Sequence, residues 1–481
     1  MAPHSSAAPK GWGGRALAGA VFAAICVVIA CAELPEQQLP PAGVLSPAEV
    51  GDRVQVLGPK GEDSDRRGAA ALAKLAAEGQ AELLQRHLGV LVAQGDVDLY
   101  RGNSVRLLID GPDTFAAMKA AVAAAREHVV LEFYIVEDEG VAFEMGELLI
   151  QKAAEGVSVA LMYDSLGSLG TSRDFFDRLQ AGGVAVCAFN PFNPMERRGK
   201  WRPVHRNHRK MLAVDGEVAY TGGINLSDVY AKGSFGSTKR KQPTPSDEEA
   251  ARSGWRDTQI ELRGPVVPAM SATFRASWQA QGCASVLPTP PPAVAAAPGQ
   301  RVVRLVTGNP KHGINPTYTL LLAATRASQR SVYLTMAYFA PGPDLVQELS
   351  DAARRGVDVR LVLPGRSDVS LVVHAARSYY AQLLEAGVKI YEMHHAVMHA
   401  KTAVIDGVLS SVGSSNLDWR SIVGNSEMDV VILGDDFARQ LDALFARDMA
   451  SSRRIDAQHW SRRNLGQRLL EKIGRFFEPL L

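Results

Sequence analysis

The chain has 481 residues. This length exceeds what a single ordinary hydrophobic core can organise, so two or three domains are expected. Its composition, 46% hydrophobic and 21% charged, is that of a globular protein. A formal net charge of +1 excludes a sequence-wide basic surface, so nucleic acid is not an expected partner. Four cysteines are too few for a disulfide scaffold, and the sequence leaves open whether Cys187 and Cys283 stay reduced.

Residues 1–31 have the pattern of an export leader. Lys10 and Arg15 precede an apolar run at 16–32, which favours a signal peptide. The run ends in Val-Ile-Ala-Cys, which resembles a bacterial lipoprotein cleavage box with Cys31 as the lipid-modified first residue. An uncleaved signal anchor and a plain cleaved signal are the alternatives. Because the positive charge precedes the run, all three predict a membrane-associated bacterial protein whose body lies on the periplasmic side.

Residues 32–104 are expected to form a tether and an N-terminal helical region. The stretch 33–49 contains four prolines, which is typical of a semi-rigid spacer. After it, one plan of helices and strands occurs twice.

The first copy predicts helices at 113–126, to about 155 and to about 182, with strands at 129–136, 157–163 and 184–189. The second predicts helices at 320–328 and 344–355, with strands at 331–339, 357–363 and 388–391. Alternating strands and helices indicate an α/β sheet covered on its faces. The expected domains are 105–283 and 301–450, joined by a linker rich in proline and alanine at 284–300.

Two further segments lie outside this plan. Residues 231–254 are polar, and they are expected to form a solvated loop, with an active-site lid or a lipid-headgroup contact as the alternative. Residues 451–481 end in a basic amphipathic segment with apolar residues at helical spacing from Leu465 to Phe477. This segment either lies in a lipid interface or packs on its own domain.

Each copy ends in the same constellation of polar residues. His-x-Lys, four residues, Asp, and a Gly-x-x-Asn sequence recur at identical spacing. The members are His208, Lys210, Asp215 and Asn225 in the first copy, and His399, Lys401, Asp406 and Asn416 in the second. Two such copies inside a visible repeat indicate an active site, and they argue against a non-enzymatic scaffold.

Each histidine and its lysine are expected to point the same way, because residues i and i+2 share one face of a strand. An ammonium beside an imidazole repels a metal cation and attracts an anion. A neutral imidazole attacks phosphorus, and lysines stabilise the charge that develops on the phosphoryl oxygens. Two facing pairs supply a nucleophile and a proton donor, so neither a divalent metal nor another cofactor is expected.

The carboxylates near these motifs have different expected roles. Asp257 and Glu427 fall at matched positions and are predicted to orient the histidines, with an ordinary strand-edge charge as the alternative. Asp215 and Asp406 complete the two catalytic motifs, but a structural role in the turns that follow is preferred. Asn225 and Asn416 either bind phosphate or cap the following helix.

These motifs resemble those of the phospholipase D superfamily. The phrases Arg-Asn-His-Arg-Lys at 206–210, Trp-Arg-Asp at 255–257 and Gly-Ser-Ser-Asn-Leu-Asp-Trp-Arg-Ser at 413–421 are similar to bacterial cardiolipin synthases of that type. The likeness implies two tandem α/β domains, each a mixed sheet flanked by helices, with one active site at their interface. It also implies a covalent phosphohistidine, with His208 as nucleophile and His399 as general acid.

The activity implied by this likeness is phosphatidyl transfer between phospholipids at a membrane surface, for example from two phosphatidylglycerols to cardiolipin and glycerol. Hydrolysis of a lipid phosphodiester, or less favourably of nucleic acid, is the alternative, since it needs only water as the acceptor.

Overall fold

The computed structural model describes residues 53–63, 65–77, 80–93, 95, 97–191, 204–234, 254–284, 287 and 297–481. The leader with Cys31, the tether at 33–49, and most of the segments 231–254 and 284–300 lie outside these residues. Among the helices described, none has the length and apolar character needed to cross a membrane.

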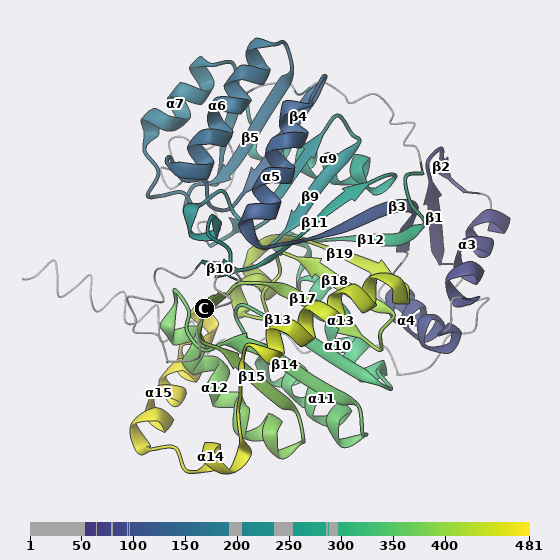
Figure 1. Ribbon diagram of the computed structural model, residues 1–481, viewed down its shortest axis with the longest axis vertical. Helices are drawn as coiled ribbons and strands as arrows, with labels where there is room; N and C mark the ends of the chain where they lie inside the picture. Colours follow the sequence, from purple (N-terminus) through teal and green to yellow (C-terminus); the bar gives the residue numbers. More distant parts are fainter. Residues whose placement is uncertain are drawn as a thin grey trace, which may run out of the picture.

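Two lobes with the same plan make up the body of the molecule (Figure 1). The first lobe, residues 97–281, contains β3 (Val97–Ile109), α5 (Asp110–Ala123), β4 (His128–Phe133), α6 (Gly140–Ala154), β5 (Ser158–Asp164), α7 (Arg173–Ala181), β6 (Ala185–Phe189), β7 (Arg206–Asn207), β8 (Met211–Val214), β9 (Val218–Gly222), the short helix η2 (Asp228–Tyr230), β10 (Trp255–Arg256), β11 (Thr258–Arg263) and α9 (Val266–Gln281).

The second lobe, residues 301–450, repeats this order. It contains β12 (Arg301–Gly308), η3 (Pro310–His312), α10 (Pro316–Ala327), β13 (Ser331–Met336), α11 (Gly342–Arg354), β14 (Asp358–Pro364), α12 (Ser370–Glu385), β15 (Lys389–Met393), β16 (Val397–Met398), β17 (Lys401–Ile405), β18 (Leu409–Gly413), the π-helix η4 (Arg420–Gly424), β19 (Asn425–Leu433) and α13 (Asp435–Ala450).

One sheet runs without a break through both lobes. The pairings give the order β6-β5-β4-β8-β9-β11-β3 in the first lobe and β12-β19-β18-β17-β13-β14-β15 in the second. Antiparallel pairing of β3 with β12 joins the two halves. In each lobe the three outer strands are parallel and the inner strands antiparallel, so the expected mixed sheet flanked by helices is confirmed.

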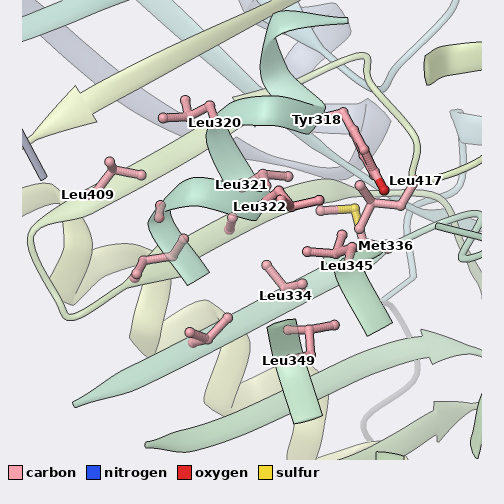
Figure 2. Packing of buried hydrophobic residues seen from close by; sticks show 14 of the residues in the cluster. Tyr318, Leu320, Leu321, Leu322, Leu334, Met336, Leu345, Leu349, Leu409 and Leu417 are labelled. Atoms are coloured by element: carbon pink, nitrogen blue, oxygen red, sulfur yellow. The ribbon is translucent and has the colours of Figure 1, made fainter. Parts of the chain in front are cut away.

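Helices cover both faces of this sheet. Helices α9 and α13 pack on one face in a core that includes residues of both lobes, such as Phe274 and Phe437. On the other face α5, α6 and α7 cover the first lobe. Helices α10, α11 and α12 cover the second lobe, where Leu321, Leu334 and Leu345 pack together in a buried hydrophobic cluster (Figure 2). Strand β8 is buried along its whole length, which explains its unbroken apolar sequence Met-Leu-Ala-Val.

The N-terminal region differs from its expected helical character. Besides α3 (Asp65–Ala77) and α4 (Ala81–Ala93) it contains the hairpin β1 (Val54–Gly58) and β2 (Gly61–Glu62). Strand β1 extends the sheet by pairing with β3, which begins at Val97, before the domain boundary expected at 105. Helix α4 buries its leucines in the core of the second lobe.

The cysteine question that the sequence left open has an answer in the structure. Cys187 of β6 and Cys283, just after α9, form a disulfide with a Cα–Cα distance of 5.8 Å. The bond ties the outermost strand of the first lobe to the end of its final helix.

The chain ends in four small elements, β20 (Arg453–Arg454), α14 (Ala457–Ser461), α15 (Leu465–Phe476) and η5 (Glu478–Leu480). Strand β20 pairs with β15 at the outer edge of the second lobe. Helix α15 begins with a capping box formed by Asn464 and Gln467.

Candidate active site

The two histidine motifs lie at matched places in the two lobes. His208 and Lys210 lie between β7 and β8, His399 lies between β16 and β17, and Lys401 is the first residue of β17. All four side chains are buried where the lobes meet. Their charges act on one another, since Lys401 and His399 both contribute to lowering the pKa of His208, after the larger effect of burial. The structure therefore brings both motifs into one site.

Each histidine is bonded to a carboxylate of the other lobe. Nδ1 of His208 lies 3.0 Å from Oε1 of Glu427, and Nδ1 of His399 lies 2.7 Å from Oδ2 of Asp257. A carboxylate on Nδ1 fixes the tautomer with its proton there, which leaves Nε2 as the nitrogen with a free lone pair. The sequence singled out both carboxylates, but their crosswise pairing comes from the fold.

Two very short parallel ladders explain why each histidine is bonded to a carboxylate of the other lobe. Strand β7 pairs with the start of β19, with Asn207 opposite Ser426, so the next residues are His208 and Glu427. Strand β10 pairs with β16 in the same way and brings Asp257 next to His399. The backbone N–H of each histidine donates across the same junction, to the carbonyl of Ser426 and of Arg256 respectively.

The lysines are held beside the histidines. Nζ of Lys210 donates to the carbonyl of His208 at 2.6 Å, and Nζ of Lys401 donates to the carbonyl of His399. Burial, which the carboxylate of Glu427 opposes, lowers the pKa of Lys210 to about 7. Burial also lowers the pKa of Lys401, against the carboxylate of Asp257. The site thus brings cationic groups together at buried positions, where an anion is bound more strongly than in water.

The two histidines differ in their electrostatic environment. Burial, followed by the charge of Lys210, lowers the pKa of His208 well below its usual value. The pKa of His399 is also lowered by burial and by Lys401, but the hydrogen bond to Asp257 opposes these effects. His208 is therefore the histidine held more firmly in its neutral form.

Aromatic rings that the sequence did not single out line the site. Tyr134, just after β4, lies edge-on to His208 with 5.0 Å between ring centroids. Tyr338, two residues after β13, lies edge-on to His399. Trp255 packs against His399 at 4.9 Å, and the hydroxyl of Tyr230 lies 3.2 Å from Nδ1 of His399. Tyrosine 230 has no counterpart in the repeated motif, so no sequence pattern pointed to it.

The motif aspartates serve the backbone. The carboxylate of Asp215 accepts from the N–H groups of Arg126, Glu127 and His128 at 2.8–2.9 Å. The carboxylate of Asp406 binds the start of β13 in the same way. Both residues have a left-handed backbone, with φ of 51° and 54°. These contacts match the structural role preferred from the sequence. Neither carboxylate contacts the catalytic histidines or lysines through a hydrogen bond that the structure describes.

Asp406 has one additional partner. Nε2 of His87, on helix α4, lies 2.9 Å from its Oδ2, and both side chains are fully buried. The N-terminal region is thereby fastened to the second motif.

The two asparagines are buried next to the motifs. Oδ1 of Asn225 accepts from the N–H of Ile135 at 3.1 Å, and its Nδ2 donates to the hydroxyl of Tyr230. The helix-capping alternative is wrong for both residues, because Ser227 caps η2 and Trp419 is the residue before η4. Binding of phosphate by Asn225 and Asn416 stays a prediction.

The two carboxylates are held in different ways. Ser414 and Ser421 donate to Glu427 at 2.5 and 2.8 Å. The residue that corresponds to Ser414 in the first copy is Gly223. A Cβ atom there would lie 2.1 Å from Oδ1 of Asp257, so the shorter carboxylate occupies the space that a side chain would need.

Buried arginines lock the lobes together around the site. Arg256 of β10 forms a two-pronged ion pair with Asp448 of α13, with both distances 2.8 Å. Arg209, between His208 and Lys210, donates to the carbonyls of Glu427 and Gly308 in the second lobe. Within the described residues, no group of three or more His, Cys, Asp or Glu side chains is arranged to hold a metal ion.

Comparisons with known proteins identify relatives of this chain. The family model described as "Cardiolipin synthase, PLD-like domain" matches residues 321–449. The cardiolipin synthase of Geobacillus sp. strain WCH70 is 32% identical over 408 residues, which cover 84% of this chain and 77% of that protein. Cardiolipin synthase 2 of Bacillus cereus is 32% identical, covering 80% and 72%, and cardiolipin synthase A of Salmonella paratyphi B is 33% identical, covering 79% and 76%.

A solved structure shares the fold. The phosphatidylserine synthase of Haemophilus influenzae Rd KW20 is 12% identical and superposes with a TM-score of 0.56, over 78% of this chain and 95% of that one. Fold and relatives together define an enzyme of the phospholipase D type. Within that class the chain belongs to the bacterial cardiolipin synthase family.

Proposed function

We propose that this enzyme is a phosphatidyltransferase that converts two phosphatidylglycerols into cardiolipin and glycerol. The observation that carries the proposal is the crosswise site, in which two buried histidines, each with an adjacent lysine, are oriented by Glu427 and Asp257. The names of the relatives supply the substrate class.

In the first half of the reaction Nε2 of His208 attacks the phosphorus of one phosphatidylglycerol. A P–N bond forms, the P–O bond to the headgroup glycerol breaks, and His399 gives its proton to the departing oxygen. Lys210 and Lys401 stabilise the charge on the non-bridging oxygens. The depressed pKa of His208 supports its place as nucleophile, because only the neutral imidazole has a lone pair to give.

The second half reverses these roles. A headgroup hydroxyl of a second phosphatidylglycerol gives its proton to His399 and attacks the phosphohistidine, which forms the new P–O bond and frees His208. Asn225 and Asn416 are proposed as phosphate-binding groups from their place beside the motifs. Water in place of the second lipid would make the enzyme a hydrolase, the alternative expected from the sequence.

We also propose that the catalytic body lies outside the cytoplasm and is attached to the membrane, with Cys31 as a site of lipidation. The leader pattern supports export, and the Cys187–Cys283 disulfide supports an oxidising compartment. Mass spectrometry of the mature N-terminus decides the form of attachment. An unmodified Cys31 still joined to Ala30 refutes lipidation.

The central experiment incubates the purified enzyme with phosphatidylglycerol and separates the lipid products, with and without a chelator of divalent cations. Cardiolipin and glycerol are expected in equal amounts in both cases, since the lysines leave no need for a metal charge. Release of phosphatidic acid alone would replace the transferase by a hydrolase on the same residues. Loss of activity with the chelator would contradict the proposed chemistry.

A further inference from the structure

Helix α15 presents its apolar side chains to solvent. Leu465, Leu469 and Phe476 are 81%, 60% and 48% exposed, and Leu470 and Ile473 lie between them on the same side. Of the ten large hydrophobic side chains that are exposed in the described part of the chain, these five are on this one short helix. A helix that only covered its own domain would turn this face inward.

The opposite face of α15 holds it on the second lobe. Gly474 lies so close to helix α12 that a Cβ atom would come within 2.5 Å of the backbone nitrogen of Ala375. Glu471 is buried there and binds Arg463 at 2.7 Å. Beyond the helix, Glu478 of η5 accepts from the hydroxyl of Tyr379 at 2.7 Å. The outward orientation of the apolar face is therefore fixed by specific contacts.

A row of basic residues flanks the apolar face. Arg468, Lys472 and Arg475 follow one another at helical spacing and line an open pocket of about 710 Å³ between α15 and helices α11 and α12. Arg475 already interacts within the protein, since its guanidinium lies over the ring of Tyr379 and near the carboxylate of Glu478. Among the residues that the structure describes, Arg468 and Lys472 have no carboxylate partner. Arg468 donates to the carbonyl of Ser461 at 2.9 Å, which leaves its charge uncompensated, so two cationic groups lie beside the apolar face.

We propose that α15 docks on an anionic phospholipid bilayer. Leu465, Leu469, Leu470, Ile473 and Phe476 enter the boundary between headgroups and acyl chains, and Arg468 and Lys472 contact the lipid phosphates. The charge pattern selects this occupant, because a second copy of the chain would bring the same basic row against itself. The proposal names the surface through which the proposed phosphatidyltransferase meets its substrate, but it rests on that function only for the identity of the substrate.

The docked helix is connected to the active site. After η5 the carbonyl of Leu481 accepts from the N–H of Arg420 at 3.0 Å, so the end of the chain reaches η4, and the charge of Arg420 acts on His208. Three other exposed apolar residues are close in sequence to residues of the site: Val204 is four residues before His208, Val229 precedes Tyr230, and Val369 follows Asp368, which accepts from the hydroxyl of Tyr338. A bilayer under α15 thereby supplies lipid near the mouth of the site.

The test places a reporter on α15 in the full-length chain, so that membrane attachment by the leader is the same for every variant. Leu469→Trp is reconstituted with vesicles of phosphatidylcholine alone or mixed with phosphatidylglycerol, with brominated acyl chains as quencher. Emission of the wild-type chain, with its six tryptophans, is subtracted. The matched control is Gln151→Trp in the last turn of α6, which is also exposed and belongs to the first lobe, whereas α15 packs on the second lobe (Figure 1).

We expect the added emission at position 469 to be quenched only in the vesicles with phosphatidylglycerol, and the emission at position 151 to stay unquenched. Arg468→Gln and Lys472→Gln should each weaken insertion about 5-fold, and high salt should act in the same direction. The proposal is overturned if position 469 is not quenched, if position 151 is quenched equally, or if quenching occurs in phosphatidylcholine alone. A blue shift at 469 that depends on protein concentration without lipid also overturns it, in favour of a second copy. Insertion without formation of cardiolipin would refute the proposed function and leave the docking surface intact.

Discussion

Glu427 and His208 are 219 residues apart and belong to different lobes, yet an oxygen of Glu427 lies 3.0 Å from Nδ1 of His208. The counterpart, Asp257 with His399, crosses the boundary in the other direction. A change in one lobe should therefore impair the histidine of the other lobe.

The crosswise contacts predict which step each carboxylate affects. Glu427→Gln and Asp257→Asn should each lower kcat for lipid transfer by about 10²–10⁴-fold, because each replaces the charged, acceptor-only carboxylate that orients a reacting imidazole by a neutral amide. With phosphatidyl-p-nitrophenol the leaving group needs no proton, so Asp257→Asn should still release a burst of p-nitrophenol. Glu427→Gln should show no burst, because its effect is on the nucleophile. The opposite pattern in stopped-flow measurements would exchange the roles of the two histidines.

The pH dependence should reflect the groups around His208. Burial raises the pKa of Glu427 to about 7, so its carboxylate form, the better acceptor for Nδ1–H, is lost as the pH falls below that value. Burial lowers the pKa of Lys210 to about 7, so its positive charge is lost as the pH rises above it. The profile of kcat/KM should be a bell with its maximum near neutral pH.

Two variants separate the limbs of this bell. Glu427→Gln should flatten the acidic limb, and Lys210→Arg should flatten the alkaline limb, because arginine keeps its charge. A profile that stays level to pH 9 in the wild-type enzyme would contradict the place given to Lys210.

Substitutions of Asp406 and of His399 should have opposite effects, one on the stability of the fold and the other on catalysis. Asp406→Asn loses charge-assisted hydrogen bonds to the start of β13 and to His87, so the free energy of unfolding should fall by about 1–3 kcal/mol. Asparagine tolerates the left-handed backbone at this position, and kcat of the folded fraction should stay close to that of the wild type. His399→Asn should do the reverse. Denaturant titration together with turnover of the same samples checks both, and an inactive but fully stable Asp406→Asn would place this carboxylate in the chemistry.

Gly223 should be intolerant of any side chain. In Gly223→Ala the new methyl group would meet the carboxylate of Asp257 and displace it from His399. We expect turnover to fall toward the level of Asp257→Asn although no charge is changed. The control is Gly156→Ala, where a Cβ atom meets nothing within 4 Å although φ is positive, so that only backbone strain is tested. Full activity of Gly223→Ala would show that the crosswise contact is dispensable.

The disulfide should contribute strongly to the stability of the first lobe. Cys187 and Cys283 are 96 residues apart, and opening a loop of that size costs roughly 4–5 kcal/mol of unfolding free energy in the chain-entropy model. Guanidinium unfolding with and without reductant should show this loss in the wild type and no response to reductant in Cys187→Ser. Identical unfolding of the wild type under both conditions would mean that the bond is not formed in solution.

The sequence was sufficient for the repeat, for the strand that begins at Lys401 or directly after Lys210, and for the two carboxylates. These features depend on local periodicity and on spacing, which a single chain displays. The strands expected at 157–163 and 357–363 correspond to β5 and β14, shifted by one residue.

The crosswise pairing could not be predicted from the sequence. It depends on two ladders, β7 with β19 and β10 with β16, and each ladder is two residue pairs long, too short to produce a recognisable strand pattern. Tyr230 and His87 were missed for a related reason. Each is a single residue whose partner, His399 or Asp406, is far away in the sequence.

The continuous sheet through β3 and β12 has a kinetic consequence. Since each lobe carries the carboxylate that the other lobe's histidine requires, a hinge motion that parted the lobes would dismantle both halves of the catalytic apparatus at once. We therefore expect the two lobes to stay together during turnover, so that the proposed lipid substrates enter and leave without a hinge motion between the lobes.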